Sequence, residues 1–567
     1  MVRVGYVRAA ATFAVAGLLA FASAAFAGGT LTQLGSTDVD YLDPGHTYYT
    51  AGFQVAYATN RTLYSFTPSD ANNPVPDLAA SAPEISADHK TVTVHLRGGV
   101  MFGPPVSREV VAKDVKYAIE RFFSYPVGGQ YALYFEPLVG APHRLTARVK
   151  RIPGIQTPDA HTLVFHLRQP VGIAFAAALV MPITAPVPEE FAKKFDRHST
   201  STYNTHVISS GPYMVANNAK GLATGYRPGR SITLVRNPNW DGASTGDYRP
   251  AYLDRIVLKT NQTNTQVAAQ QVLDGRNLIL DSNPPTNLFP RVIASPQHVT
   301  VPSGGFRYLP MNTSKPPFNN INVRRAVMAG FSRVAARRAR GGKYAGDIAT
   351  HFLPPAFPGF DQAGGATGFG FDFFNAGNAN GNRRVAARYF RKAGMKSGHY
   401  EGHHRVFVVG ANADPGKAQA LVVRRQLRRL GFKVRLKLVP QDAVYTDWCQ
   451  IPRRKVDMCA GAGWFKDFAD PASMLEPVFK SSFITRYGNL NYSQLRDRKL
   501  DRAMNAADLL EGDARLQAWA AIDRRIVGDA AGIPFLWDTT TLVRSRNVSG
   551  QAASYYTSWD LSFMQVS

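Results

Sequence analysis

The sequence predicts a large protein of the α/β class with two or three domains. Segments in which apolar residues alternate, as they do in a strand, are intermixed along the whole chain with segments of helical periodicity. The 567 residues, of which 45% are hydrophobic and 19% charged, have the composition of a globular protein and several times the length of a typical domain. The 48 glycines and 37 prolines follow no regular period, so they indicate turns.

Residues 1–27 have the pattern of an export signal. Arg3 and Arg8 supply a positive start, the following stretch to Phe26 is uncharged, and residues 25–27 have the small-x-small pattern of a cleavage site. A retained membrane anchor is the alternative, but the run is rich in alanine and only just long enough to span a bilayer. No cysteine lies near the cleavage site. We therefore expect an exported protein, periplasmic or in the cell envelope or medium, that is not a lipoprotein.

Two alternating segments in the first third of the chain predict strands that close hairpins. They are residues 91–96 and 162–167, and each follows a turn-forming segment that contains aspartate. Between them, the apolar residues of 111–122 recur at helical spacing, which predicts a helix with one apolar face.

The remaining elements continue the intermixing of strands and helices. Further strands are predicted at residues 29–34, 231–235, 253–259, 405–409 and 432–438, and further helices at 265–274, from Asn322 as cap to about Phe331, and from Pro415 to Leu430. Gly275 and Gly431 are suited to end two of these helices. The glycine- and asparagine-rich stretch 363–382 is expected to be a flexible insertion.

The net charge of +25, from 65 basic and 40 acidic residues, is the unusual feature of the composition. Such an excess is typical of proteins that bind nucleic acid or anionic surfaces. The basic residues are spread along the chain without a Lys/Arg tail. The pairs Arg424-Arg425 and Arg428-Arg429 fall off the apolar stripe of their predicted helix, so we interpret them as a solvated face. No nucleic-acid partner is expected.

Motifs of enzymes are weak in this sequence. There is no H-E-x-x-H and no G-x-x-x-x-G-K-[ST] motif, and we identify no nucleophile–base arrangement. We expect no catalytic residue, no cofactor and no enzymatic activity.

Histidines near residue 400 permit a metal hypothesis. His399, Glu401 and His403 would point the same way in an extended segment, with His404 beside them, and such side chains are ligands for nickel or zinc. The alternative is a polar loop before the strand at 405–409, and we expect no metal site.

Cys449 and Cys459 are the two cysteines of the chain. In an oxidising compartment they could close a small loop across a helix–strand junction. Their spacing is not C-x-x-C, so a redox or metal-binding pair is not favoured.

The segment 461–471 is the most informative for function. Its glycine-rich strand end delivers Trp464, Asp467 and Phe468 into a turn. In a cleft, a tryptophan can stack on a ligand and a buried carboxylate can pair with an ammonium group. A core tryptophan followed by a capping aspartate is the alternative, and composition alone leaves both open.

A series of short motifs follows in a specific order along the chain. The motifs are Tyr41–Pro44, Arg61–Tyr64, Asp77–Ala79 with Val94–Phe102, Asp114–Arg121, Ser210–Tyr213, Leu234–Trp240, Asn312–Phe318, Val323–Val327 and Trp464–Phe468. In this order they resemble the family 5 solute-binding proteins of ABC importers, the oligopeptide-, dipeptide- and nickel-binding class. The sequence departs from the family pattern at Val111, where a threonine usually caps the helix.

The resemblance implies a two-lobed, periplasmic-binding-protein-like fold (type II, cluster C-like) with an extra domain in one lobe. The implied limits are a signal peptide at 1–27, a discontinuous domain I at 28–65, 185–304 and 530–567, the extra domain II at 66–184, and domain III at 305–529. Ligand would bind between the lobes and be enclosed when they close.

Site residues also follow from the resemblance. In the peptide-binding branch the acid of W-x-x-D-Y holds the α-ammonium group of the ligand, and this role carries over to Asp467. The residues implied to bind ligand are Asp467, Trp464, Asn312, Tyr48, Tyr49 and Tyr131.

The expected function is therefore capture of peptides, or of a related small solute, for delivery to the membrane permease of an ABC importer by a monomeric protein. A nickel chelate, an opine or an oligosaccharide would suit the same fold. An exported hydrolase on a two-lobed scaffold and a basic nucleic-acid binder are the more distant alternatives.

Overall fold

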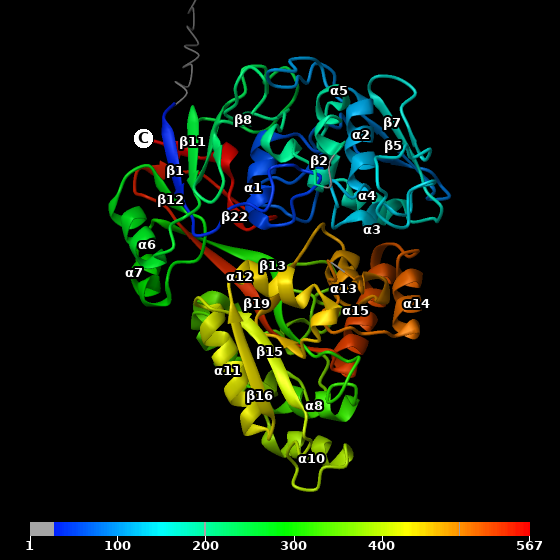
Figure 1. Ribbon diagram of the computed structural model, residues 1–567, viewed down its shortest axis with the longest axis vertical. Coiled ribbons are helices and arrows are strands. Elements are labelled where there is room, and N and C mark those ends of the chain that lie inside the picture. Colours follow the sequence, from blue (N-terminus) through cyan, green and yellow to red (C-terminus); the bar gives the residue numbers. More distant parts are fainter. Residues whose placement is uncertain (1–27, 198–199, 487) are drawn as a thin grey trace, which may run out of the picture.

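The structure is a computed structural model that describes residues 28–197, 200–486 and 488–567. Strands and helices are intermixed along the chain and build two lobes, one above the other in Figure 1, so the fold is of the α/β class. The predicted export signal lies outside the described residues. Among those residues, no helix has both the length and the apolar character needed to cross a membrane.

The upper lobe is built on a mixed sheet that joins distant parts of the chain. Its strands are β1 (Thr30–Leu34), β8 (Tyr213–Val215), β9 (Tyr226–Arg227), β10 (Ser231–Arg236), β11 (Arg255–Lys259) and β12 (Leu278–Leu280), in the order β12-β1-β11-β10-β8 with β9 on β10. β1 runs parallel to both β11 and β12, and β10 runs antiparallel to β11. The predicted helix at 265–274 is confirmed as α6 (Thr265–Asp274), where the Asn264 side chain accepts from the amide of Val267.

The extra domain contains both predicted hairpins. β4 (Glu84–Ile85) pairs with β5 (Thr91–His95), and β6 (Ile155–Gln156) pairs with β7 (Thr162–His166), all antiparallel. β5 and β7 then pair with each other and complete the sheet β4-β5-β7-β6.

α2 (Ala112–Phe122) confirms the helix predicted between these hairpins. Although Val111 has no capping hydroxyl, the Asp114 carboxylate accepts from the Val111 amide at 2.9 Å. This contact satisfies one of the free donors at the helix start from the helix side.

Two long strands connect the lobes. β13 (His298–Pro310) and β19 (Gly532–Val543) pair antiparallel from His298 opposite Val543 to Pro310 opposite Gly532, with a register shift between Pro302 and Phe306. Val301 belongs to the hydrophobic core of the upper lobe, whereas Phe306 belongs to that of the lower lobe. The strands therefore cross from one lobe to the other, as seen at the centre of Figure 1.

The lower lobe contains the predicted α–β unit. β15 (Arg405–Ala411), α11 (Gly416–Arg429) and β16 (Lys433–Val439) follow one another, and the two strands pair in parallel. The other longer helices are α8 (Ile321–Gly330), α9 (Arg333–Ala339), α10 (Arg383–Lys392), α13 (Pro471–Phe479), α14 (Arg498–Ala507) and α15 (Gly512–Asp529). Parallel pairing requires the crossover that α11 supplies.

The remaining helices and strands are short, apart from α1, which has ten residues. They are α1 (Thr50–Thr59), α3 (Ala132–Phe135), α4 (Gly172–Ala178), α5 (Glu189–Ala192), α7 (Phe289–Ile293), α12 (Gln441–Ala443), β2 (Tyr64–Ser65), β3 (Val75–Pro76), β14 (Gly346–Asp347), β17 (Met458–Cys459), β18 (Ala462–Phe465), β20 (Val548–Ser549), β21 (Ala552–Ala553), β22 (Ser558–Trp559) and β23 (Gln565–Val566).

Two local expectations in the lower lobe were wrong. The cap of α8 is Asn320, whose side chain accepts from the amide of Asn322, and not Asn322 itself. The stretch 363–382, expected to be a flexible insertion, packs Ala363, Phe373 and Phe374 into the core of the lower lobe. Its glycines allow the turns, while these apolar side chains hold the segment in place.

The motif residues Asp43 and Arg121 form one buried ion cluster with Asp196. Arg121 donates to both oxygens of Asp43 at 2.8 Å and to those of Asp196 at 2.9 and 2.7 Å, and its side chain is fully buried. Bidentate pairing of this kind satisfies the guanidinium in a fixed geometry. The cluster anchors the segment that precedes Tyr48 to α2 of the extra domain.

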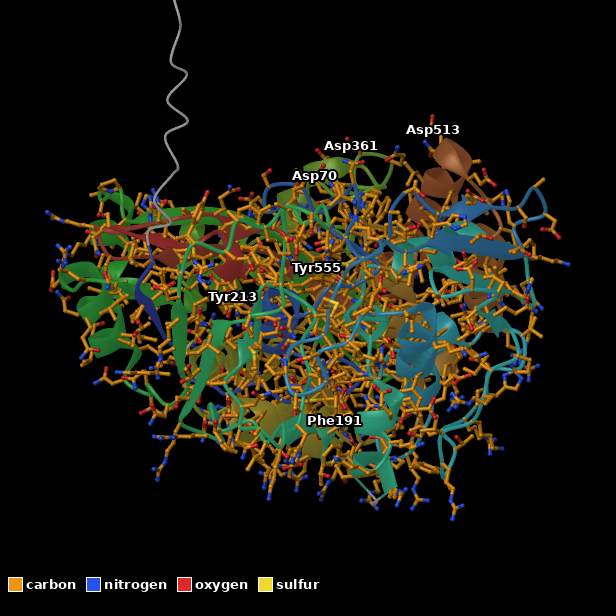
Figure 2. The ribbon with its side chains drawn as sticks, turned by 90° about the horizontal axis from the view of Figure 1, so that it is seen from above. Asp70, Phe191, Tyr213, Asp361, Asp513 and Tyr555 are labelled. Carbon is orange, nitrogen blue, oxygen red and sulfur yellow. A yellow bond between two sulfur atoms is a disulfide. The ribbon has the colours of Figure 1, made fainter. Side chains whose placement is uncertain are left out.

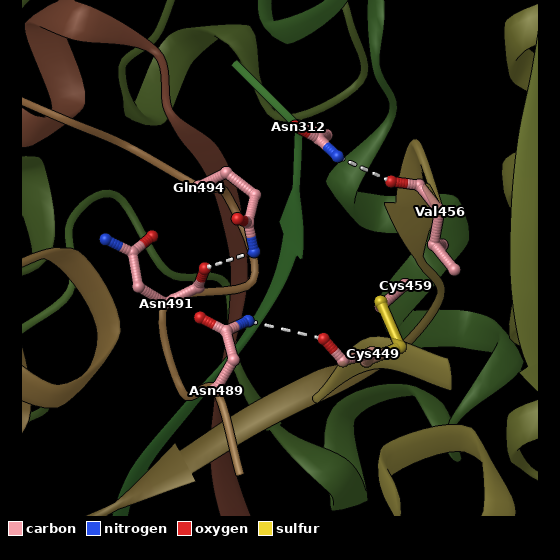
Figure 3. Close-up of a disulfide and its surroundings, with 7 residues drawn as sticks. All are labelled: Asn312, Cys449, Val456, Cys459, Asn489, Asn491 and Gln494. Carbon is pink, nitrogen blue, oxygen red and sulfur yellow. Dashed lines mark hydrogen bonds between the residues drawn. A yellow bond between two sulfur atoms is a disulfide. The ribbon is translucent and has the colours of Figure 1, made fainter. Parts of the chain in front are cut away.

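A disulfide joins Cys449 to Cys459 in the lower lobe (Figure 3). It closes the loop between a π-helical turn, Val444–Cys449, and β17. The helix–strand junction that the sequence suggested is therefore where the bond lies.

We expect replacement of both cysteines by serine to lower the free energy of unfolding by about 3 kcal/mol, because a closed loop of this length restricts the unfolded chain. Urea unfolding of the oxidised protein and of the double variant measures the difference. A Cys449→Ser, Cys459→Ser variant that unfolds at the same urea concentration as the oxidised protein would contradict it.

Candidate ligand-binding cleft between the lobes

The turn after β18 carries Asp467 from the lower lobe to the upper lobe. β18 pairs with β13, with Trp464 opposite Phe306. Two residues beyond the strand, Asp467 is 4% exposed. The next residue, Phe468, packs into the core of the extra domain and meets the Tyr134 ring edge-on, with ring centroids 4.9 Å apart. Asp467 therefore lies where the two lobes meet.

Aromatic rings from both lobes surround this position. In the upper lobe, Tyr131 stacks on Tyr48 with centroids 5.5 Å apart and on Tyr134 at 6.2 Å. From the lower lobe, Trp464 lies 6.3 Å from the Tyr48 ring, and its indole donates to the carbonyl of Ser473 at 2.7 Å. Trp464 thus belongs to the core of the lower lobe and also faces the other lobe. Such rings offer flat apolar surfaces for a ligand.

The carboxyl of Asp467 has an uncharged hydrogen-bond donor. The Tyr134 hydroxyl donates to Oδ2 at 2.6 Å, and no ion pair of Asp467 occurs among the described residues. Burial raises the pKa of Asp467 to about 8, although the Tyr134 hydrogen bond lowers it. The Tyr555 hydroxyl donates to the backbone carbonyl of Asp467, and Tyr555 lies near the centre of the molecule in Figure 2. Below that pH the closed cleft holds a neutral acid.

A second charged region lies further along the lobe contact. Arg307 on β13 forms an ion pair with Asp538 on β19, and its guanidinium lies over the Phe465 ring at 5.0 Å. The neighbouring Arg340 donates to Gln419 at 3.2 Å. Burial, and then the positive charge of Arg307, lower the pKa of Arg340 to about 10. Among the described residues, Asp538 pairs with Arg307, and its charge also raises the pKa of Arg340.

Tyrosines of the lower lobe connect these two regions. Tyr445 interacts electrostatically with Arg307, the ring of Tyr445 lies 6.2 Å from that of Tyr492, and Tyr492 interacts electrostatically with Tyr48 of the upper lobe. Sequence reasoning missed Arg307, Arg340, Tyr445 and Tyr492. An available signal was Arg307 itself, a cation within the otherwise apolar strand segment 306–309.

The other two implied ligand residues have different surroundings. Tyr49 lies beside Tyr48, with ring centroids 5.9 Å apart, and its amide donates to Asp40 at 3.1 Å. The Asn312 amide donates to the carbonyl of Val456 at 2.9 Å, next to the disulfide loop (Figure 3). Its oxygen accepts from both the amide and the hydroxyl of Ser314. The Asn312 side chain thus forms these hydrogen bonds within the lower lobe, and none of them is to Asp467.

The histidine segment does not gather into a metal site. Glu401 accepts from the amides of Lys396 and Ser397, and His404 pairs with Asp457 at 3.0 Å. Across the described ranges, no group of three or more histidine, cysteine or acidic side chains could hold a metal ion.

One segment of the chain matches a serine motif of hydrolases. Residues 242–246 match the pattern G-x-S-x-G of hydrolases, and the prediction from sequence that the chain has no such motif was wrong. The Ser244 hydroxyl donates to Asp241 at 2.6 Å, and Ser244 lies exposed in a turn. A hydrolase elbow places its serine between a strand and a helix with a base in reach, so this match has the wrong context.

Known proteins are similar to this chain in sequence and in fold. The periplasmic oligopeptide-binding protein OppA of Escherichia coli strain K12 is 24% identical over 518 residues, covering 89% of this chain and 86% of that protein. The solved structure of the clavulanic acid biosynthesis oligopeptide binding protein 2 aligns with a TM-score of 0.81 and 25% identity, covering 95% of this chain and 96% of the other.

A third similar structure holds a ligand that is not a peptide. The binding protein AgaA in complex with agropinic acid, from A. tumefaciens R10, aligns with a TM-score of 0.73 and 20% identity, covering 95% of this chain and 99% of the other. The model of the bacterial extracellular solute-binding proteins, family 5, matches residues 73–485. That span is most of the chain, and the chain belongs to this family of extracellular solute-binding proteins.

Proposed function

We propose that this protein captures short peptides with a free N-terminus between its lobes and delivers them to the permease of an ABC importer. The observation that carries the proposal is Asp467, a buried acid without an ion-pair partner among the described residues, surrounded by aromatic rings from both lobes. An ammonium group is the complement of such a carboxylate, because it supplies both charge and hydrogen-bond donors. In the liganded state, the ammonium group of the peptide would take the position of the Tyr134 hydroxyl beside Asp467.

The arginine region supports a ligand with charges at both ends. Arg307 pairs with Asp538, whose charge also acts on Arg340, and a ligand carboxylate would relieve the mutual repulsion of the two arginines. Tyr48, Tyr445 and Tyr492 lie between the two charged regions and would contact the middle of the ligand. A peptide carries this pattern of ammonium, flat amides and carboxylate.

We expect the lobes of the ligand-free protein to open as the pH rises from 5 to 8. The closed cleft holds Asp467 protonated up to about pH 8, whereas in an open cleft the carboxyl has its ordinary pKa near 4. In that window the closed state binds a proton that the open state lacks. The population of the closed state relative to the open state therefore falls by up to about tenfold for each unit by which the pH rises. Small-angle scattering of stripped protein at several pH values measures the change in radius of gyration.

Asp467→Asn is the matched control for the opening, because asparagine stays neutral over the same pH range. Its radius of gyration should change less with pH than that of the wild type. Equal pH dependence in both proteins would show that Asp467 does not control closure.

An opine or other zwitterionic small molecule is the second candidate ligand. The structural similarity to AgaA with agropinic acid supports it, and a cleft lined by uncharged tyrosines between an acid and two arginines would also suit such a compound. The opine proposal differs from the peptide proposal in the length of the ligand and in whether the ligand requires a free primary amine.

The test of the proposed function is calorimetry on residues 28–567 after partial unfolding has removed any carried-over ligand. A pool of short peptides with free N-termini is titrated first, followed by the same pool after N-acetylation. Binding of the free pool alone is expected. Binding of neither pool by correctly refolded protein would contradict the peptide proposal and direct the search to opines, sugars and chelates, and turnover of bound peptide would indicate a hydrolase.

A further inference from the structure

The excess positive charge is concentrated in one part of the chain. Residues 307–455 contain 27 lysines and arginines against seven acidic residues, a net charge of +20 out of the total of +25. This stretch is about a quarter of the chain. The expectation that the basic residues are simply spread along the chain is therefore incomplete, because 27 of the 65 lie in this stretch.

Part of this stretch lies away from the upper lobe, whereas Arg307 and Arg340 lie at the lobe contact. α10 is at the lower end of the molecule in Figure 1, and α8, α11, β15 and β16 lie above it in the lower lobe. α11 contributes the densest group of cations. Its 14 residues include Lys417 and four arginines, and none is acidic.

The four arginines of α11 form an open face, which we call the arginine face: Arg424, Arg425, Arg428 and Arg429. Arg425, Arg428 and Arg429 are exposed and Arg424 is partly exposed. Together with Leu421 they line a surface groove. Over the described residues, none of the four forms an ion pair. The negative end of the helix dipole stabilises cations in the last turn only, so it does not account for the whole face.

Apolar anchors are missing from this region. In the described part of the chain, the large apolar residues with high exposure all lie outside 307–455: Tyr125, Val139, Leu222, Val267, Ile293, Leu509 and Leu510. Stable protein–protein interfaces place aromatic or aliphatic anchors at their centre. A region with strong charge and no such anchor is suited to a broad anionic surface rather than to a protein partner.

We propose that the arginine face of α11 binds the anionic phospholipid headgroups of a membrane surface. Each lysine or arginine held near such a surface contributes about 1 kcal/mol of attraction, and the rest of residues 307–455, with a net charge of +16, adds a field of the same sign. The contact would keep the protein close to the membrane in which a permease works. The inference goes beyond the proposed transport role and is independent of which solute the cleft holds.

The test is sedimentation of residues 28–567 with two kinds of vesicle, one of equal parts dioleoylphosphatidylglycerol and dioleoylphosphatidylcholine, the other of phosphatidylcholine alone. The test variant is Arg424→Gln, Arg425→Gln, Arg428→Gln, Arg429→Gln. The matched control removes four exposed cations of the upper lobe that form no ion pair among the described residues: Arg144→Gln, Arg148→Gln, Lys150→Gln, Arg227→Gln. Solute binding and the thermal midpoint confirm that both variants are folded.

The wild type is expected to bind only the anionic vesicles at 50 mM salt and to be released at 500 mM salt, because the attraction is screened. The test variant should bind on the order of 1,000-fold more weakly, and the control should change less than about threefold. Equal losses in the two variants, or no binding to anionic vesicles at low salt, would overturn the proposal. Release of vesicles by 10 mM glycerol phosphate at constant ionic strength would assign the face to a soluble phosphate, and tighter binding to a DNA duplex would assign it to nucleic acid.

Discussion

Asp467→Asn is expected to reduce the affinity for peptides with a free N-terminus by roughly two to three orders of magnitude. Removing one partner of a buried charge pair typically costs 2–5 kcal/mol, because the other charge is left desolvated without compensation, and each 1.4 kcal/mol is tenfold in affinity. The asparagine has the same shape and can still accept from the Tyr134 hydroxyl. Calorimetry with one defined tripeptide, free and N-acetylated, measures the loss.

The folded state should tolerate this substitution. Since burial raises the pKa of Asp467 to about 8, the ligand-free closed protein already holds a neutral side chain at neutral pH, and a neutral amide replaces it. Asp361→Asn, which removes an exposed acid of the same lobe, is the matched control and should leave the affinity unchanged. An Asp467→Asn protein with affinity within about threefold of the wild type would refute the role given to this carboxylate.

Arg121→Met is expected to lower the free energy of unfolding by about 3–5 kcal/mol. Arg121 is the cation between Asp43 and Asp196, and all three side chains are buried. Methionine fills a similar volume but leaves two carboxylates facing each other in a buried site, which is the costly way to break an ion cluster. Because Asp43 anchors the segment that leads to Tyr48, ligand affinity should fall as well.

Urea unfolding of the ligand-free protein measures the effect of Arg121→Met. The control is Arg388→Met, which removes the partner of Asp372 from an ion pair whose two side chains are about half exposed. Exposed pairs contribute between 0 and about 1 kcal/mol, so this variant should unfold close to the wild type. Similar losses in both variants would show that the burial of the Arg121 cluster is not the source of its stabilising effect.

Local patterns in the sequence were sufficient to predict many of the elements. Alternation predicted β5, β7 and β10, and turn residues before β5 and β7 predicted their hairpins. These features depend on neighbours within a few residues, where apolar periodicity and turn chemistry act directly. The cap of α8 was misplaced by two residues, because several asparagines precede that helix and only the backbone conformation selects among them.

The cleft was predicted only in part. The segment with Trp464 and Asp467 was singled out because a glycine-rich strand end is followed by an acid and aromatic residues, and the family resemblance implied their role in binding a ligand. Arg340, Tyr445 and Tyr492 come from separate segments, and only the packing of the lower lobe brings them near Arg307 and Tyr48. No local pattern in the sequence indicates that these residues lie close together.

The sequence by itself determined the α/β class, the main strands and helices, and the family resemblance from which the role proposed for Asp467 follows. Each rests on residue types at short spacing, which the chain carries in any conformation. The tertiary structure alone decided that Asp43 and Arg121 share one buried cluster, that Asn312 bonds within the lower lobe, and that no acidic side chain pairs with the arginines of α11 among the described residues. Burial and charge are properties of surroundings, and these surroundings exist only once distant segments have packed together.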